Sequence, residues 1–150
     1  MIRPAKSADY EEVERIMKQV QKLHTVWRPD IYKPCDPVLP YEAYSKMVNS
    51  EEVLVAETDG KVVGLLTYEH RHTESVGRVK RDVLYIHAMV VDEAYRGQGI
   101  GHQFFDYMRR LAAEKNYDSI ELQVNAKNRA AYEMYRNYGF REKSINMELL

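Results

Sequence analysis

Three glycines at alternate positions form the most informative segment of the sequence, Arg96-Gly97-Gln98-Gly99-Ile100-Gly101. An apolar run that ends at Val91 precedes them and apolar residues at helical spacing follow, which predicts a strand, a short turn and a helix. The first turn of a helix presents unpaired N–H groups, and glycines let an anion approach them closely. We therefore expect a diphosphate to bind at residues 96–101, with the guanidinium group of Arg96 as a further donor.

Two familiar nucleotide-binding motifs do not fit this segment. A dinucleotide fingerprint that starts at Gly97 requires a sixth-position glycine, where the sequence has His102. A P-loop requires Gly-Lys-Ser/Thr, and this string does not occur. A glycine-rich helix start without any ligand is the remaining alternative, although three glycines there cost stability.

Composition narrows the class of protein. The chain has 150 residues, with 22 basic and 23 acidic side chains and a net charge of -1, which argues against nucleic-acid binding. A lone Cys35 excludes an internal disulfide and a cysteine-based zinc cluster, so we expect no metal and a reducing compartment. We find neither a signal-peptide pattern nor an apolar run of membrane-spanning length, and therefore expect a cytoplasmic protein without membrane contact.

The hydrophobic pattern predicts a mixed α/β fold in one domain over residues 1–150, with helices between strands only in the second half. In the first half we expect a helix capped by Ser7 that ends before Pro29, a proline-rich loop over 27–40, a helix over 41–48, strands over 53–58 and 62–68 joined at Asp59-Gly60, and a polar connection over 69–80. In the second half we expect a strand over 82–91, a helix over 99–116, a strand over 120–124, a helix over 128–135 and a strand over 140–149.

The spacing of Arg96, Gly99 and Gly101 resembles the Arg/Gln-x-x-Gly-x-Gly/Ala signature of the GNAT superfamily of N-acetyltransferases, which bind acetyl-CoA. A second element of that superfamily resembles Asn128, Ala131, Tyr135, Gly139 and Phe140 at the expected spacings. The resemblance is close from about Val83 onward. It implies a central, mixed, mostly antiparallel twisted sheet of six to seven strands flanked by about four helices.

The resemblance also assigns cofactor contacts. It implies that the backbone amides of Met89, Val90 and Val91 hold the pantetheine arm and polarise the thioester carbonyl, while Arg96 to Gly101 take the pyrophosphate. Asn125 and Asn128 match positions where polar side chains meet pantetheine. As plain sequence, both asparagines could equally satisfy a turn and a helix N-cap.

Tyr135 is the candidate general acid, because a phenol with a pKa near 10 can return a proton to a leaving thiolate whose pKa is roughly 8.5. The alternative is a tyrosine whose ring belongs to the core and whose hydroxyl is incidental. His87 is the candidate base that takes a proton from the attacking amine, and its alternative is a hydrogen-bonded core residue. Glu69, His70 and His72 are other options for the base, as is a relay through water.

The acceptor site is less defined by the sequence. Trp27, Tyr32, Tyr41 and Tyr44 could line an amine pocket, or could pack the proline-rich loop onto the body. Cys35 has no base partner in the sequence and is therefore not expected to act as a nucleophile.

We therefore expect an acetyl-CoA-dependent N-acetyltransferase that moves acetyl directly to a primary amine of a small molecule or peptide in a ternary complex. The alternative is a non-catalytic module that binds or senses CoA. The identity of the amine acceptor and the length of the acyl group stay open. We also expect a homodimer that forms through the last strand, residues 144–150.

Overall fold

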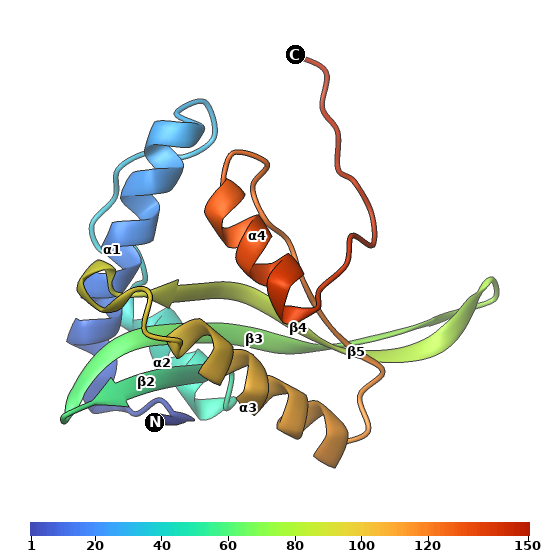
Figure 1. Ribbon diagram of the computed structural model, residues 1–150, viewed down its shortest axis with the longest axis horizontal. Coiled ribbons are helices and arrows are strands. Elements are labelled where there is room, and N and C mark those ends of the chain that lie inside the picture. The colour runs from blue at the N-terminus through green and yellow to red at the C-terminus, as the bar shows by residue number, and fades with distance from the viewer.

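The structure is a computed structural model that describes residues 1–150, and it shows a five-stranded sheet with helices packed on both faces (Figure 1). The strands lie in the order β1 (Ile2–Pro4), β2 (Val53–Thr58), β3 (Lys61–Ser75), β4 (Arg78–Val91), β5 (Ser119–Leu122). The helices are α1 (Tyr10–Trp27), α2 (Tyr41–Asn49), α3 (Ile100–Glu114) and α4 (Arg129–Tyr138). All neighbouring strands are antiparallel except β4 and β5. The expected mixed α/β fold with a mostly antiparallel sheet is confirmed.

Two apolar clusters hold the helices on the sheet. On one face, Val13 and Ile16 of α1 and Tyr44 of α2 pack against strand residues that include Leu65 and Val90. These helix residues recur at helical spacing, so their burial is the main reason the two helices form. On the other face, Phe104, Phe105 and Met108 of α3 pack against residues that include Leu84 and Ile86 of β4.

The hairpin of β3 and β4 is longer than expected. The sequence predicts a polar connection over residues 69–80, but β3 continues to Ser75 and β4 begins at Arg78. Charged and polar residues alternate along this outer hairpin, which projects from the end of the sheet (Figure 1). The prediction was wrong because these residues face solvent and carry no apolar alternation, although their backbones pair throughout.

The end of the chain differs from the prediction as well. The sequence predicts a strand over 140–149, whereas no regular structure follows α4, and the sheet has five strands instead of six or seven. The alternating apolar residues of this segment, Ile145, Met147 and Leu149, are exposed and face no partner strand. The homodimer contact through residues 144–150 stays a prediction.

Smaller differences concern the ends of elements. A 3-10 turn at Ser7–Asp9 precedes α1, so the helix begins at Tyr10 and is not capped by Ser7. The predicted strand over 120–124 ends at Leu122, and α4 continues past Tyr135 to Tyr138. None of the helices combines the length and the apolar character that crossing a membrane requires.

Near its middle, β4 contains one extra residue relative to β3. Thr67 pairs with Ala88 and Tyr68 pairs with Ile86, so His87 has no partner in the register. Such a β-bulge bends the strand and changes which side chains face each side of the sheet. Leu84 and Ile86 pack with α3 before the bulge, and Met89 and Val91 contact the same cluster after it.

A buried carboxylate joins α1 to the end of β4. Asp92 is 3% exposed and pairs with Arg15 at 2.8 Å through its Oδ2 atom. Its Oδ1 atom accepts hydrogen bonds from the Ala94 amide at 3.1 Å and from Gln19 Nε2 at 3.3 Å. Gln19 Oε1 in turn accepts from the Glu93 amide at 3.0 Å. These contacts fix the 3-10 turn Glu93–Tyr95, and with it the segment that leads into α3.

Burial alone would raise the pKa of Asp92, but the hydrogen bonds from Ala94, Arg15 and Gln19 outweigh it and lower the pKa below its ordinary 3.8. A carboxyl group with a lowered pKa stabilises the fold above its unfolded-state pKa, and this stabilisation is lost as the pH falls through the folded-state value.

Asp92→Asn should therefore lower the free energy of unfolding at neutral pH by about 1–3 kcal/mol, the range for hydrogen bonds to a charged group. Urea denaturation from pH 7 to pH 2 should show a constant difference from the native protein down to about pH 4, which then shrinks. Asp59→Asn, at an exposed turn, is the matched control and should change little. A difference that is independent of pH would contradict the role given to the carboxylate.

Candidate functional site

The backbone N–H groups of residues 96–102 donate to no acceptor within the protein. Gly99 occupies the N-cap of α3 and offers no side chain, whereas the N-cap of α4, Asn128, accepts from the Ala131 amide at 3.2 Å. The start of α3 therefore combines the positive end of a helix dipole with a run of free donors. Such a site can bind the oxygens of a phosphate or diphosphate.

The three glycines of this segment are required for different structural reasons. Gly97 and Gly99 have φ values of 77° and 80°, which disfavour other residues, and a Cβ atom at either position would meet nothing within 4 Å. Gly101 lies inside the helix, and a Cβ atom there would lie 3.2 Å from Sδ of Met134. The first two glycines keep the approach to the amides open, and the third lets α4 pack against the start of α3.

β4 has a free edge directly before this segment. The parallel pairing with β5 ends at Ile86 and Leu122, while β4 continues to Val91 and pairs only with β3. The Asp92 amide donates to the Val63 carbonyl on the β3 side at 2.8 Å, so alternation points the amides of Met89 and Val91 to the free edge. An extended ligand can pair with this edge as an added strand.

An open cleft of about 450 Å³ lies between α1 and the glycine segment. Its lining includes Lys18 and Lys22 of α1 and Arg96, whose Nε atom donates to the Val91 carbonyl at 3.2 Å. Lys18 pairs with Asp36, but Lys22 and Arg96 form no ion pair, so these two cations outnumber the one acidic residue of the lining, Glu93, beside the free amides. We missed these lysines in the sequence, where their spacing of four residues on the helix face away from Val13 and Ile16 was the available signal.

Tyr135 lies on α4 with its ring in the core. The ring makes edge contacts with Phe105 and Phe140, each at a centroid distance of 5.8 Å. The hydroxyl group has no hydrogen-bond partner in the protein, and burial raises the pKa of Tyr135 above its ordinary 10.0. The core position described by the alternative interpretation is thus observed, and it leaves the hydroxyl group available for a ligand.

His87 is half-exposed and lies at the bulge in β4. Its Nε2 atom is 3.3 Å from Oε1 of Glu69, and its ring contacts that of Tyr85 at a centroid distance of 5.2 Å. Hydrogen bonds from Arg71 and His87 lower the pKa of Glu69. His87 therefore has a carboxylate partner that can orient its ring.

His87 and Tyr135 lie on opposite sides of the sheet. Leu84 and Ile86 belong to the cluster that packs with α3, so alternation places Tyr85, and with it His87, on the other side. Tyr135 belongs to the α3 side. An acid and a base placed in this way can act from the two sides of a group bound at the free edge of β4.

The two asparagines satisfy local backbone groups. Asn125 Oδ1 accepts from the Lys127 amide at 2.9 Å in a turn, and Asn128 caps α4. Both structural interpretations from the sequence are therefore observed.

Of the aromatic residues near the proline-rich loop, Tyr44 packs in the core, whereas Tyr32 and Tyr41 are exposed, and their place in an amine pocket stays a prediction. Tyr44 is fully buried, and Tyr41 contacts the Tyr10 ring at 5.1 Å. Glu14 accepts from the amides of Val38 and Leu39, which holds the loop along α1. His70 and His72, the other options for the base, contact Asp82 on the outer hairpin and not His87 or Tyr135.

Comparison with known proteins identifies the family. A family model described as acetyltransferase (GNAT) family matches residues 17–140. A probable N-acetyltransferase named san from Drosophila melanogaster is 33% identical over 125 residues, which is 83% of this chain and 62% of that protein. An uncharacterized N-acetyltransferase, MJ1207, from Methanocaldococcus jannaschii is 33% identical over 91 residues, 61% of this chain and 39% of that protein. The chain thus spans less than two thirds of the length of these curated relatives.

Several solved structures share the fold of this chain. A mutant of the BH1408 protein from Bacillus halodurans has a TM-score of 0.97 and 32% identity, covering 100% of this chain and 98% of that one. The aminoglycoside N-acetyltransferase AAC(6′)-Iy, solved in complex with CoA, has a TM-score of 0.73 at 16% identity, with 100% and 98% coverage, and so shows the fold alone. From the family match over most of its length and this shared fold, we conclude that the chain belongs to the GNAT family of acetyltransferases.

Proposed function

We propose that this protein transfers the acetyl group of acetyl-CoA directly to a primary amine of a small molecule or peptide, within a ternary complex. The observation that carries the proposal is the run of free backbone amides at residues 96–102, which leads on from the free edge of β4. The CoA complex of the structurally similar aminoglycoside acetyltransferase supports the choice of donor.

The glycine segment would hold the diphosphate of the donor. Gly97 and Gly99 place no side chain beside the amides, and the Nη atoms of Arg96 have no protein partner. Lys22 adds positive charge along the same cleft. The chain as a whole has a net charge of -1 and does not attract anions, but the groups at this site fit a doubly charged anion.

The free edge of β4 would hold the pantetheine arm. The amides of Met89 and Val91 point to this edge, and Val90 lies between them in the strand, with its side chain in the α1 and α2 cluster. Donation from a fixed backbone amide to the thioester carbonyl would stabilise the negative charge that develops on its oxygen during attack. Asn125 and Asn128 lie in the connection between β5 and α4, and we propose that they border the arm from that side.

Two side chains would handle the protons. The Glu69–His87 pair would remove the proton from the attacking ammonium group, directly or through water, so that the neutral nitrogen can attack the carbonyl carbon. Once the carbon–sulfur bond breaks, Tyr135 would donate a proton to the leaving thiolate, and the second proton that the nitrogen loses as the amide forms would return to Tyr135 through water. Cys35 is exposed and hydrogen-bonds to no base, which favours direct transfer over an acyl-enzyme.

Two measurements test the activity. Isothermal titration calorimetry with acetyl-CoA should show one site per chain, and a panel of small amines and peptides should release free CoA thiol with at least one acceptor.

Arg96→Met should weaken acetyl-CoA binding roughly tenfold to a hundredfold, because the variant loses a charge-assisted hydrogen bond to the diphosphate. Arg110→Met, on the exposed side of α3, is the matched control.

The outcomes distinguish the alternatives. Tight binding with no thiol release from any acceptor would identify a non-catalytic CoA-binding module. Absence of acetyl-CoA binding would refute both functions.

Tyr135→Phe should reduce kcat on the order of a hundredfold while leaving acetyl-CoA affinity and thermal stability nearly unchanged, because the ring stays in the core and only the hydroxyl group is lost. Tyr132→Phe on the same helix, where the hydroxyl group bonds Glu142, should keep full activity. Unchanged turnover in Tyr135→Phe would leave the tyrosine a packing role only.

His87→Gln should reduce kcat/KM roughly tenfold to a hundredfold, because the amine loses its proton acceptor. The loss of activity toward low pH, where a base is protonated, should also disappear from the pH profile of the variant. Glu69→Gln should cause a smaller loss, since the imidazole remains without its carboxylate partner. A wild-type pH profile in these variants would contradict the role of His87 as the base and would favour a relay through water.

A further inference from the structure

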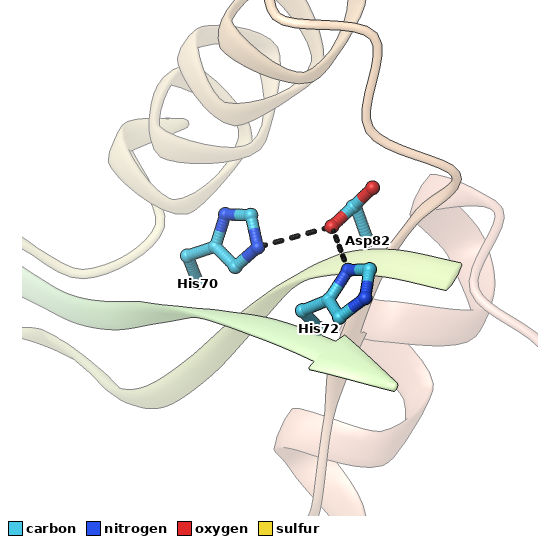
Figure 2. A group of neighbouring side chains, drawn as sticks. All are labelled: His70, His72 and Asp82. Atoms are coloured by element: carbon cyan, nitrogen blue, oxygen red, sulfur yellow. Dashed lines mark hydrogen bonds and ion pairs between the residues drawn. The ribbon is translucent and has the colours of Figure 1, made fainter. Parts of the chain in front are cut away.

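Two histidines and a carboxylate converge on the outer hairpin, away from the proposed acetyl-transfer site (Figure 2). His70 and His72 are two residues apart on β3 and therefore point to the same side, and Asp82 of β4 lies directly opposite His72 in the register. Figure 2 shows both imidazole rings turned toward the carboxylate of Asp82. The regular register of the hairpin between Tyr68 and Thr73 thus brings the three side chains together.

The facing atoms are close enough to share one ion. Oδ1 of Asp82 lies 2.8 Å from Nδ1 of His72 and 3.1 Å from Nε2 of His70, and all three ligand atoms lie within 4.8 Å of one another. Tetrahedral zinc, with bonds of about 2.0–2.1 Å, holds its ligand atoms about 3.3 Å apart. Because the side chains of both histidines are nearly half exposed, small rotations can reach this geometry, and an ion can enter from solvent.

The outer nitrogen of each ring also has a partner. Nδ1 of His70 lies 2.9 Å from the hydroxyl oxygen of Tyr117, and Nε2 of His72 lies 3.5 Å from Oε2 of Glu74. The backbone of Asp82 is fixed by the Asp118 carboxylate and amide, each at 2.8 Å. Histidines that bind a metal typically donate the other ring N–H to such groups, which selects the tautomer and orients the ring.

The neighbouring arginine side chains do not enter the space between His70, His72 and Asp82. Arg71 and Arg81 alternate with the cluster along their strands and bind Glu69 and Ser119 instead. The carboxylates of Asp82 and the nearby Glu74 bring negative charge to the cluster, which favours a cation.

We propose that His70, His72 and Asp82 bind one divalent transition metal ion of the zinc class, with water at the fourth position. Two imidazole nitrogens favour zinc, cobalt or nickel over magnesium and calcium, which prefer oxygen ligands. The ion would join β3 to β4 and, through Tyr117, to the connection between α3 and β5. Asp82 precedes His87 by five residues, about 16 Å along an extended strand, so the site is separate from the proposed proton acceptor.

Equilibrium dialysis of the untagged full chain against Zn²⁺ should show one ion per chain, released by a chelator. At free Zn²⁺ a hundredfold above the dissociation constant, the melting temperature should rise by roughly 5–10 °C. Co²⁺ should give visible d–d absorption. Absence of saturable Zn²⁺ binding would overturn the proposal.

Variants assign the ligands. His70→Gln, His72→Gln and Asp82→Asn should each weaken Zn²⁺ binding at least tenfold, and Tyr117→Phe should weaken it by about tenfold, as expected of a positioning residue. His102→Gln lies outside the cluster and should bind as the native protein does. Wild-type affinity in His72→Gln, or equal loss in His102→Gln, would also overturn the site. The exposed His70→Gln decides the outcome if Asp82→Asn does not fold, as judged by circular dichroism.

Discussion

The proposed donor site depends on backbone N–H groups that the protein itself does not satisfy. At residues 96–102 the chain presents donors without acceptors, which is costly unless water or an anion takes them. The buried Asp92 fixes the turn that leads into this segment, through its contacts with Arg15 and Gln19 of α1. A helix on one face of the sheet therefore positions the start of a helix on the other, and the proposed donor site depends on α1 through these contacts as well as through Lys22.

The bulge at His87 is the second constraint, because it changes the alternation of β4. Before it, Leu84 and Ile86 face α3, and after it Met89 and Val91 do, while Val90 packs with α1 and α2. The same irregularity turns the amides of Met89 and Val91 toward the edge that β5 has left. Without the extra residue, these amides would pair with β3. The end of β5 at Leu122 thus leaves the edge of β4 free, and the inserted residue decides which amides face that edge.

The sequence predicted what depends on local signals and missed what depends on distant pairing. The glycine segment, the Asp59-Gly60 hairpin and the amphipathic helices were recognised because turn chemistry and helical spacing are local. The outer hairpin was missed because its polar strands owe their structure to pairing alone. The strand over 140–149 was expected from alternating apolar residues, but alternation does not supply a neighbouring strand. Likewise Asp92, Arg15 and Gln19 meet only in the folded chain.

The burial of Tyr135 has two opposing effects on its proposed role. It raises the pKa of the phenol, so complete proton transfer to a thiolate is less favourable than ordinary pKa values suggest. It also keeps the hydroxyl group protonated across the working pH range and strengthens its hydrogen bond to a developing negative charge, because the surroundings are weakly polar. We therefore propose that Tyr135 stabilises the leaving thiolate by a hydrogen bond in the transition state, and that its proton moves to the sulfur only after the carbon–sulfur bond has broken.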